Sequence, residues 1–432
     1  MPILIDNVQA VLEAPQGGFR VGTTSIYIKN GKIASLNGLP EGETFTRRVD
    51  GAGKLLIPGL INCHTHIPMT ILRNVADDLQ FHEWLFGRII PLEEKLAPED
   101  CYWAAQLGLM EMLRTGTTCF LDMYFHIDHI ARAVADAKAY GVLSRGLVGG
   151  ADDPAGGEQR LRGALDEIDR WRDNDHVSFM LAPHAPYTCD PGYQREVAAE
   201  AARLGLGIHT HISESGREVN ESWEKHGKSP VALMDETGLL TPRTVAAHCV
   251  HVDDQDIETL ARRGVHVAHN PVSNLKLANG VAPVGKLRAA GVNVGIGTDG
   301  PASNNAMNMF RDLGLAAILH KGVTGDPEMV TAGQALEMAW ASGAQVLGLA
   351  DRTGKLAVGY RADLALVDLS APNLQPVNDP VCALAYSATG HEVALTMVGG
   401  KILYENGGFP TIDAERVAVE VEAICRRIGL RG

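Results

Sequence analysis

The chain has 432 residues, of which 45% are hydrophobic, and it carries a formal net charge of -14 at pH 7. This length exceeds a typical domain of about 100–200 residues, so we expect one large domain and a smaller one. Nucleic acids and anionic membranes require a basic surface, and an acidic chain is therefore not expected to bind either of them. A small molecule is the expected partner.

Two further features concern the cellular compartment. The first segment, MPILIDNVQAVLEAP, has no basic region followed by a long apolar run, and no stretch approaches about 20 uninterrupted apolar residues. The seven cysteines are dispersed without a CxxC pair, which is typical of reduced thiols. Cys63 and Cys249 adjoin histidines, but strand alternation predicts that they face the other way and pack. A cytoplasmic protein is predicted.

The two ends of the chain share a β-rich character. Residues 1–57 contain short alternating segments such as SIYIKNGKIASL, and residues 358–405 repeat that pattern in GYRADLALVDL and VALTMVGGKILYENG, with NG turn signals in both. We therefore predict one composite β-sandwich domain formed by residues 1–57 and 358–432. An amphipathic helix over residues 414–427 is predicted to complete it.

Residues 58–357 are predicted to form the catalytic domain. Eight short apolar, β-branched runs follow one another there: GLINCHTH, GTTCFLDM, VLSRGLVGG, VSFMLAPH, LGIHTHIS, TVAAHCVH, GVHVAHNP and VNVGIGTDG. Most are separated by segments of helical character, at residues 98–115, 130–140, 163–172, 192–204, 255–263 and 284–290. This alternation predicts an α/β fold, a closed (β/α)8 TIM-like barrel, with an open doubly wound sheet as the alternative.

Histidine recurs near the C-terminal ends of these runs. Five runs end in histidine and the eighth ends in aspartate, giving His64 and His66, His184, His209 and His211, His248 and His251, His266 and His269, and Asp299. In a barrel this rim holds the active site. His64 and His66 are two residues apart on one strand, so both can face one ion. Two partly buried, hydrogen-bonded histidines are the alternative.

A metal site becomes the stronger interpretation when the later runs are included. His211 ends the fifth run, and Asp299 ends the eighth, which neighbours the first in a closed barrel. Three imidazoles and one carboxylate suit zinc or iron and leave a position for water. Glu214 is close enough to His211 to face the ion without binding it. If the barrel were wrongly inferred, these residues would be unrelated core and surface groups.

Ordered motifs along nearly the whole chain resemble the amidohydrolase superfamily: PGLINCHTH, the HxxES of residues 211–215, AAHCVH and GTDGPASNN. MTILRNVADDLQFHEWLFGRIIPLEEKL, DMYFH, APHAPYTC and HNPVSNLKLANG are similar to its branch of 5'-methylthioadenosine and S-adenosylhomocysteine deaminases. The resemblance implies one divalent metal ion, zinc or iron, bound by His64, His66, His211 and Asp299. Binuclear members carry a lysine after the fourth strand, where LAPHAPY has none.

Three residues are predicted to carry the chemistry of deamination. Displacing ammonia from a purine requires a strong nucleophile, and a divalent metal generates one by lowering the pKa of water from about 15.7 towards about 7. Glu214 is the candidate for moving the proton to the ring nitrogen and then to the leaving amine, with a solvated glutamate at a helix start as the alternative. His248 would hold the attacking oxygen, and Asp299 would both bind metal and accept a proton.

Substrate-binding roles follow from the resemblance. Glu93 would accept hydrogen bonds from the ribose hydroxyls, and His184 would reach a ring nitrogen of adenine, beside Glu214 and Asp299.

Arg145 and Arg160 match arginines that bind the amino-acid carboxylate of S-adenosylhomocysteine, with a surface ion pair as the alternative for each. Arg160 is predicted on a loop, GGADDPAGGEQR, and residues 149–158 are hypothesised to close over the substrate. His209 is predicted to support the ligands rather than to bind metal. Trp84 is a candidate for the pocket wall, with a plain core residue as the alternative, and His82 receives no role.

The predicted function is hydrolytic deamination of an adenosine-type nucleoside, namely 5'-methylthioadenosine, S-adenosylhomocysteine, adenosine or 5'-deoxyadenosine. The alternatives are an aminohydrolase for guanine, cytosine, a pterin or an s-triazine, and a non-catalytic barrel that only binds. Glu93 and the two arginines favour a substrate with a ribose and a carboxylate. The sequence leaves open the preferred substrate, zinc against iron, and the oligomeric state, including a homodimer or homotetramer.

Overall fold

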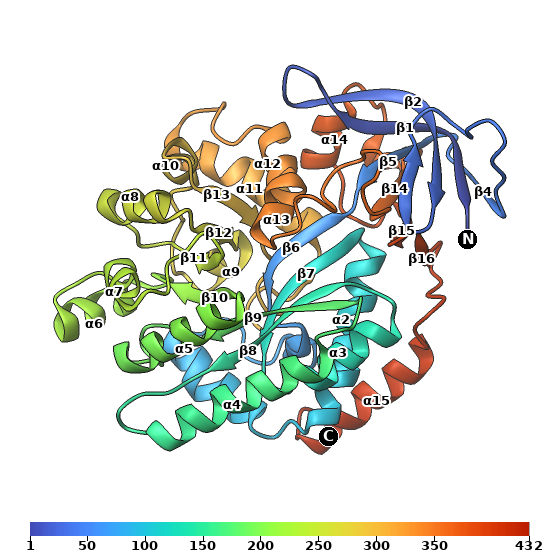
Figure 1. Ribbon diagram of the computed structural model, residues 1–432. Helices are drawn as coiled ribbons and strands as arrows, with labels where there is room; N and C mark the ends of the chain where they lie inside the picture. Colours follow the sequence, from blue (N-terminus) through green and yellow to red (C-terminus); the bar gives the residue numbers. More distant parts are fainter. Residues whose placement is uncertain (432) are drawn as a thin grey trace.

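Two eight-stranded sheets organise the computed structural model, which describes residues 1–431 (Figure 1). The larger unit contains the parallel sheet, whose strands follow one another in chain order: β6 (Leu60–Thr65), β7 (Thr117–Tyr124), β8 (Gly141–Leu147), β9 (Val177–Pro183), β10 (Gly207–Ile212), β11 (Thr244–His248), β12 (His266–His269) and β13 (Asn293–Ile296). These strands coincide with the eight predicted runs. Their nearly continuous burial is typical of parallel strands covered on both faces.

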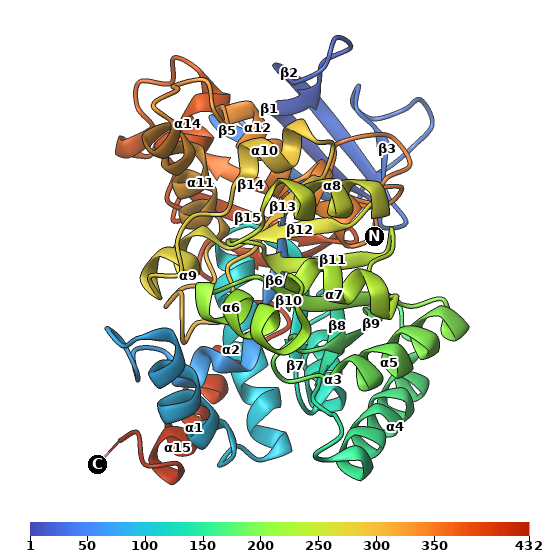
Figure 2. The same ribbon diagram turned by 90° about the vertical axis from the view of Figure 1, so that its left-hand side faces the viewer.

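Helices connect and surround these strands (Figures 1 and 2). They are α2 (Pro98–Arg114), α3 (Ile127–Asp136), α4 (Pro154–Trp171), α5 (Pro191–Leu204), α6 (Gly216–His226), α7 (Pro230–Thr237), α8 (Asp254–Arg263), α9 (Pro271–Lys276), α10 (Val284–Ala289), α11 (Met309–Thr324), α12 (Ala332–Ala339) and α13 (Ala341–Val346). The six predicted helical segments correspond to α2, α3, α4, α5, α8 and α10. The predicted (β/α)8 architecture is therefore confirmed.

The start of α4 differs from the prediction, because residues 154–160 are helical and not part of a loop. Asp153 is the N-cap and accepts a hydrogen bond from Gly156 N at 3.1 Å, while Pro154 occupies the first turn, where no backbone donor is needed. Two glycines make this helix start difficult to predict from the sequence, because glycine has a low helix propensity. Gly157 is needed for close packing, since a Cβ there would lie 3.3 Å from Gly149 Cα.

The parallel sheet closes between β13 and β6 through a short polar seam. Asn62 Nδ2 donates to Thr298 Oγ1 at 2.7 Å, and Thr298 N donates to Asn62 Oδ1 at 3.0 Å. Asp299 N donates to the carbonyl oxygen of His64 at 2.9 Å. The seam therefore places Asp299 beside the first strand, as a closed barrel predicts.

The second sheet is mixed and unites the two ends of the chain. Its strands are β1 (Ile3–Glu13), β2 (Phe19–Lys29), β3 (Lys32–Ser35), β4 (Arg47–Asp50), β5 (Lys54–Pro58), β14 (Leu364–Asp368), β15 (Val393–Val398) and β16 (Lys401–Glu405). Antiparallel pairing of β5 with β14 joins the two halves, and Figure 1 shows them side by side. The predicted pairing of the ends is confirmed, while the domain boundaries at 57/58 and 357/358 stay a prediction.

This sheet separates two apolar cores. Leu56 packs with Ile5 and Leu366 in a small cluster that belongs to the sheet. Its neighbours Leu55 and Ile57 point the other way and join the main core, which continues into the barrel. The period of two along a strand thus attaches the sheet to the barrel.

The remaining short elements are η1 (Ile67–Leu72), η2 (Glu83–Ile89), α1 (Ile90–Glu93), η3 (Pro372–Leu374), α14 (Pro380–Tyr386) and α15 (Ala414–Arg427). The predicted C-terminal helix is present as α15 and lies against α2 of the barrel (Figure 1). Arg427 at its end forms an ion pair with Asp100 and donates to the carbonyl oxygen of Lys95 at 3.1 Å.

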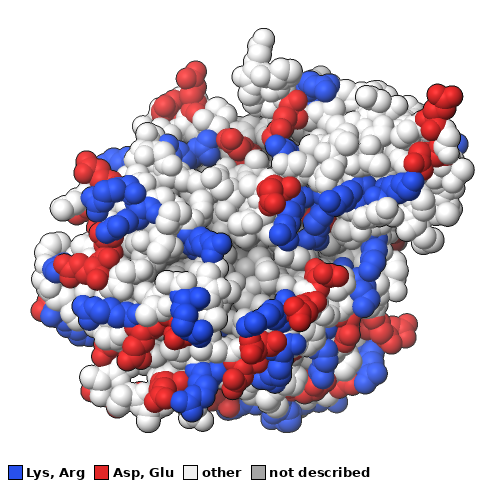
Figure 3. Space-filling model, in the orientation of Figure 1, with Lys and Arg blue, Asp and Glu red and all other residues white. Residues whose placement is uncertain are grey.

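Charged side chains of both signs intermingle on the face shown in Figure 3. Acidic and basic groups form many exposed ion pairs there and elsewhere, such as Arg162 with Glu158 and Lys286 with Asp254. Within residues 1–431, no helix has both the length and the apolar character needed to cross a membrane.

The closing seam makes a prediction about stability. Replacing Asn62 with alanine removes both of these hydrogen bonds and leaves the buried backbone N–H of Thr298 without a partner, while Thr298 Oγ1 keeps its bond to the carbonyl oxygen of Asp299. We expect Asn62→Ala to lower the free energy of unfolding by about 2–4 kcal/mol, measured by urea denaturation. The exposed Asn220→Ala on α6 is the control. Equal stability of the two variants would contradict the closing role of Asn62.

Candidate active site

The predicted metal ligands meet at the C-terminal ends of the barrel strands. His64 lies on β6, His66 follows it directly, His211 lies on β10, and Asp299 follows β13. His248, the last residue of β11, joins them. Strand alternation turns both His64 and His66 into the barrel mouth.

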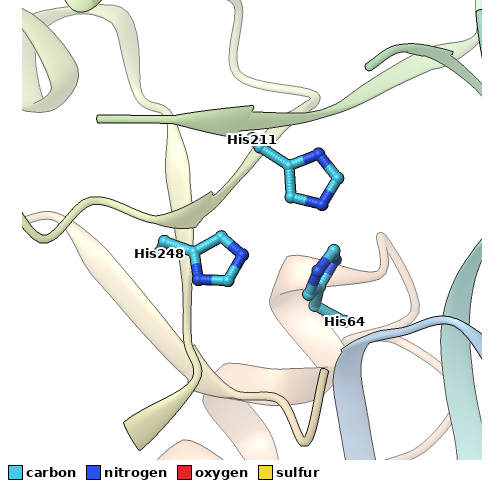
Figure 4. Close-up of side chains that lie close together, drawn as sticks. All are labelled: His64, His211 and His248. Atoms are coloured by element: carbon cyan, nitrogen blue, oxygen red, sulfur yellow. The ribbon is translucent and has the colours of Figure 1, made fainter. Parts of the chain in front are cut away.

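The ligand atoms of these side chains surround one small volume. Asp299 Oδ1 lies 3.4 Å from His64 Nε2 and 3.3 Å from His66 Nε2, and His66 Nε2 lies 3.4 Å from His211 Nε2. Four atoms bound tetrahedrally to one zinc ion lie about 3.3 Å from one another. Figure 4 shows that His64, His211 and His248 also turn their rings towards one another. The fold thus brings the four predicted ligands together.

Hydrogen bonds on the outer side of each ring determine which nitrogen faces the centre. His66 Nδ1 donates to the carbonyl oxygen of Met123 at 2.5 Å, and His211 Nδ1 donates to that of His184 at 2.7 Å. His248 Nδ1 lies 2.7 Å from Asn274 Oδ1. Because Nδ1 carries the proton in each ring, Nε2 presents a lone pair to the centre, as in metal-binding histidines.

The orientation of His64 is controlled through His209. The hydroxyl of Ser144 donates to the carbonyl oxygen of Asp122 at 2.7 Å, so its oxygen accepts from His209 Nδ1 at 3.0 Å. His209 Nε2 then accepts from His64 Nδ1 at 2.7 Å, which leaves the lone pair of His64 Nε2 facing the centre. His209 therefore positions a ligand and does not itself face the metal-binding volume.

The chemistry of this cluster fits a divalent cation. Burial lowers the pKa of His64 to about 3 and lowers the pKa values of His66 and His211, so these rings stay neutral. Within the described residues, Nε2 of His64 and of His248 is buried without a hydrogen-bond partner. Buried lone pairs that converge without a donor are unfavourable unless a cation binds them. The structure thus supports a divalent metal ion held by this His/Asp set.

Asp299 is held rigidly for its role. Gly300 N donates to Oδ1 at 2.7 Å, while the hydroxyls of Ser273 and Ser303 donate to Oδ2 at 2.5 and 3.0 Å. Both Asp299 and His248 adopt left-handed backbone conformations, with φ of 60° and 75°. Non-glycine residues adopt this conformation at a cost of roughly 1–3 kcal/mol, and it is concentrated at functional sites.

Glu214 lies beside the metal-binding cluster without contacting its centre. Asn279 Nδ2 donates to Glu214 Oε1 at 3.0 Å, and Glu214 Oε2 lies 3.7 Å from His248 Nε2. Glu218 accepts hydrogen bonds from the backbone N–H groups of Ser213 and Glu214 and so anchors the turn. Burial, assisted by the charge of Asp299, raises the pKa of Glu214 well above its usual range. A carboxyl that holds its proton more firmly than an exposed one and lies beside the metal-binding cluster suits a role in proton transfer.

Several of these supporting residues were not singled out from the sequence. Asn274 orients His248, Asn279 orients Glu214, and Ser273 holds Asp299. All three lie in the segment HNPVSNLKLANG after the seventh barrel strand and are buried. A cluster of buried polar residues at a strand end is the signal that could have revealed them.

A pocket of about 440 Å³ opens onto the cluster, and Glu93 and His184 line it as predicted. Burial raises the pKa of the Glu93 carboxyl to about 7, and its Oε1 has no hydrogen-bond partner among the described residues. His184 Nδ1 interacts with the hydroxyl of Thr188 at 3.0 Å, so its Nε2 is available. Trp84, the candidate for the pocket wall, also lines the pocket, and its Nε1 donates to the carbonyl oxygen of Ala302 at 3.4 Å.

The two predicted carboxylate-binding arginines are not brought into this pocket. Arg145 Nη1 lies 2.9 Å from Glu167 Oε2, and Arg160 Nη2 lies 2.6 Å from Asp153 Oδ2. Arg160 Nη1 also donates to the carbonyl oxygen of Val148 at 2.8 Å. Both guanidinium groups are thus occupied by partners within the chain, and their predicted role stays a prediction.

Two other histidines lie outside the cluster. His82 is exposed and packs on Phe86, with ring centroids 4.7 Å apart. His251 Nε2 donates to the carbonyl oxygen of Asn279 at 2.7 Å, so it supports the residue that orients Glu214.

Comparisons with known proteins agree with this site. Residues 55–403 match the amidohydrolase family, and the chain therefore belongs to that family of hydrolases. A 5-methylthioadenosine/S-adenosylhomocysteine deaminase of Moorella thermoacetica is 45% identical over 391 residues, which cover 90% of this chain and 91% of the relative. Within the family, the chain groups with these deaminases, and the predicted resemblance is confirmed.

Solved structures show the same fold. An adenosine deaminase from Xanthomonas campestris with bound zinc superposes with a TM-score of 0.92 at 34% identity, covering 99% of both chains. Atrazine chlorohydrolase from Arthrobacter aurescens TC1, complexed with zinc, superposes with a TM-score of 0.91 at 26% identity, covering 98% of this chain and 99% of that one.

The role of His209 can be tested without removing any ligand. His209→Ala deprives His64 Nδ1 of its acceptor and frees the ring to rotate or change tautomer. Loss of such a supporting partner lowers metal affinity by about 10–100-fold, which competition with a chelator would measure. His226→Ala, an exposed histidine on α6, is the control. Unchanged affinity in His209→Ala would show that the ring does not position His64.

Proposed function

We propose that this protein is a metal-dependent hydrolase that deaminates an adenosine-type nucleoside to the inosine analogue and ammonia. 5'-Methylthioadenosine and S-adenosylhomocysteine, the substrates in the name of its Moorella relative, are the leading candidates. The observation that carries the proposal is the position of Glu214 and His248 beside the metal-binding cluster, in a pocket that also contains Glu93. The carboxyl of Glu93 can accept hydrogen bonds from two hydroxyl groups. A ribose offers two such hydroxyls, whereas a bare heterocycle offers none.

We further propose that the metal is a single zinc ion bound by His64, His66, His211 and Asp299, with iron as the alternative. Three imidazoles and a carboxylate are donors that zinc prefers. The zinc in the Xanthomonas and Arthrobacter structures supports this choice. A single ion is supported by the end of β9, where Pro183 and His184 stand and no lysine is available to bridge two ions. Metal analysis of the purified protein decides between zinc and iron.

When bound, the metal ion supplies Lewis-acid activation of water at neutral pH. Glu214 takes a proton from the attacking water through Oε2, because Asn279 occupies Oε1. The same carboxyl gives the proton to the purine ring nitrogen and assists the departure of the amino group. His248 holds the water through Nε2, which lies 4.0 Å from Asp299 Oδ2. Asp299 accepts the second proton of the attacking water, and this proton passes to the amino group, which leaves as ammonia.

Residues at both ends of the pocket orient the substrate in this proposal. Glu93 accepts hydrogen bonds from the two ribose hydroxyls, and His184 bonds a ring nitrogen of the purine. Burial lowers the pKa of His184 to about 4, so its ring is neutral when the substrate binds. Trp84 and Phe125 provide apolar surface for the nucleoside.

A cytoplasmic location and self-association remain part of the proposal. All seven cysteines are free thiols in the structure, and Cys382 is the exposed one. Free thiols persist in a reducing compartment, which supports the cytoplasm.

An ammonia-release screen tests the function. Adenosine derivatives, free bases and s-triazines would be offered to the metal-loaded protein, and we expect turnover of adenosine derivatives alone. Glu214→Gln should lower kcat by about 100–10,000-fold with its metal content unchanged, because the proton carrier is lost. Glu224→Gln, exposed on α6, is the matched control. Turnover of a free base or a triazine without any adenosine derivative would refute the proposal.

Glu93 makes a prediction about pH. The ribose hydroxyls donate to the ionised carboxylate more strongly than to the acid, so substrate binds more tightly above the pKa of about 7. KM should therefore fall as the pH rises from 6 to 8. Glu93→Gln should raise KM about tenfold at pH 8, remove this pH dependence of KM and change kcat little.

Glu99→Gln, an exposed residue of α2, is the control for Glu93. A KM that depends on pH equally in wild type and in Glu93→Gln would assign the titration to another group.

A further inference from the structure

We propose that Asp312 on α11 is a positioning residue for the reaction, because it holds Asn304, which in turn fixes the peptide bond that leads into Asp299. This inference rests on the proposed function, in which Asp299 binds the metal ion and accepts a proton. Asp312 itself does not line the pocket, so its effect on the reaction passes through other residues.

The first argument is the way in which the peptide bond between Thr298 and Asp299 is held. Its carbonyl oxygen accepts a hydrogen bond from Asn304 Nδ2 at 2.7 Å, and its N–H donates to the carbonyl oxygen of His64 at 2.9 Å. The planar peptide unit therefore cannot turn without breaking one of these two hydrogen bonds. The left-handed φ of 60° at Asp299 is measured from this fixed plane, so the plane helps to aim the carboxylate.

The second argument is the orientation of the Asn304 side chain. Its Nδ2 also donates to Asp312 Oδ2 at 2.9 Å, so both N–H groups of the amide have acceptors. An asparagine amide carries two donors on nitrogen and only acceptors on oxygen. Two acceptors beside the nitrogen therefore favour one orientation of the amide, and Asp312 supplies the second of them.

The third argument is burial. Thr298, Asn304 and Asp312 are all 0% exposed. Burial raises the pKa of Asp312 to about 8, and the hydrogen bond from Asn304 is the largest effect that opposes this rise. Water does not replace a partner that is lost between fully buried groups, so removing Asp312 leaves an Asn304 donor unpaired.

The fourth argument is that the first turn of α11 contacts this segment twice. Besides the bond to Asp312, Asn304 accepts at its backbone carbonyl oxygen from Arg311 Nη1 at 3.1 Å. The preceding residue, Ser303, donates to Asp299 Oδ2 at 3.0 Å. Figure 1 shows α11 beside β13, the strand that Asp299 follows. The helix thus supports both the backbone before Asp299 and its carboxylate.

A purely structural role is the alternative, because an acidic residue in the first turn of any helix interacts favourably with the helix dipole. Asp256 on α8 provides the matched case. It lies in the first turn, is only 5% exposed and accepts from the hydroxyl of Ser229. Its replacement should lower stability without reaching the active site.

The first test compares the metal affinity of folded variants by competition with a chelator, and their stability by urea denaturation. Asp312→Leu keeps the approximate shape but removes the acceptor, so we expect metal affinity to fall by about 10–100-fold. Asp312→Asn retains an oxygen that accepts from Asn304 and should keep most of the affinity. Asp256→Leu should lower stability alone. Wild-type affinity in Asp312→Leu, or an equal loss in Asp312→Asn, would overturn the inference.

The second test separates kcat from KM at saturating metal. Asp312→Leu should lower kcat by about 10–100-fold, because a displaced Asp299 no longer meets the reacting groups correctly. KM should change little, because Glu93 and His184 orient the nucleoside and are not held by α11. A higher KM with an unchanged kcat would contradict a positioning role.

The third test asks whether Asp312 acts through Asn304. Asn304→Ala removes the same link from its other end and should weaken metal binding at least as much. Adding Asp312→Leu to Asn304→Ala should then cost little further affinity, because groups that act as a unit are not additive. Additive losses would overturn the route through Asn304.

Asn304→Ala alone also decides the matter if Asp312→Leu does not fold, since wild-type affinity in it would overturn the inference. Failure of these variants to behave as expected, with an active wild type, leaves the proposed deaminase intact. A wild-type protein that neither binds metal nor deaminates any adenosine derivative would overturn both.

Discussion

Several imidazole lone pairs and a carboxylate oxygen converge in a buried volume, and this electrostatic constraint organises the active site. His64, His66 and His211 can present Nε2 to one point only if each Nδ1 has an acceptor elsewhere. The carbonyl oxygens of Met123 and His184 provide two of these acceptors. Lone pairs that converge in a buried volume destabilise the folded protein unless a cation binds them. Metal binding and the stability of this region are therefore coupled.

The barrel supplies the rigidity that this arrangement needs. Its strands are parallel, so the ends of β6, β10 and β11 and the turn after β13 open at the same rim. His248 and Asp299 stand at the points where the chain leaves its strand in a left-handed conformation, which turns each side chain inwards. The hydrogen bonds from Ser273 and Ser303 to Asp299 offset the cost of that conformation. Strain is thus located where the ligand geometry requires it.

The sequence revealed those features that depend on local pattern. Buried parallel strands are continuous apolar runs, so all eight were visible, and the polar residues that interrupt their ends identified His64, His211 and Asp299. Features that depend on contacts between distant segments were not visible. The partnership of His64 with His209 involves residues 145 positions apart, and that of Arg145 with Glu167 crosses from a strand to the next helix.

The start of α4 shows a different limit. Asp153 followed by Pro154 is a typical sequence signal for the start of a helix, but the glycines that follow predict a loop. The glycines are present for packing, since Gly157 lies where a Cβ would be 3.3 Å from Gly149 Cα. Because tertiary packing overrides intrinsic propensity here, Arg160 is carried by a helix and not by a loop. Its guanidinium bonds the N-cap residue Asp153, so the same residue that starts α4 also orients Arg160, a contact that the local sequence pattern does not reveal.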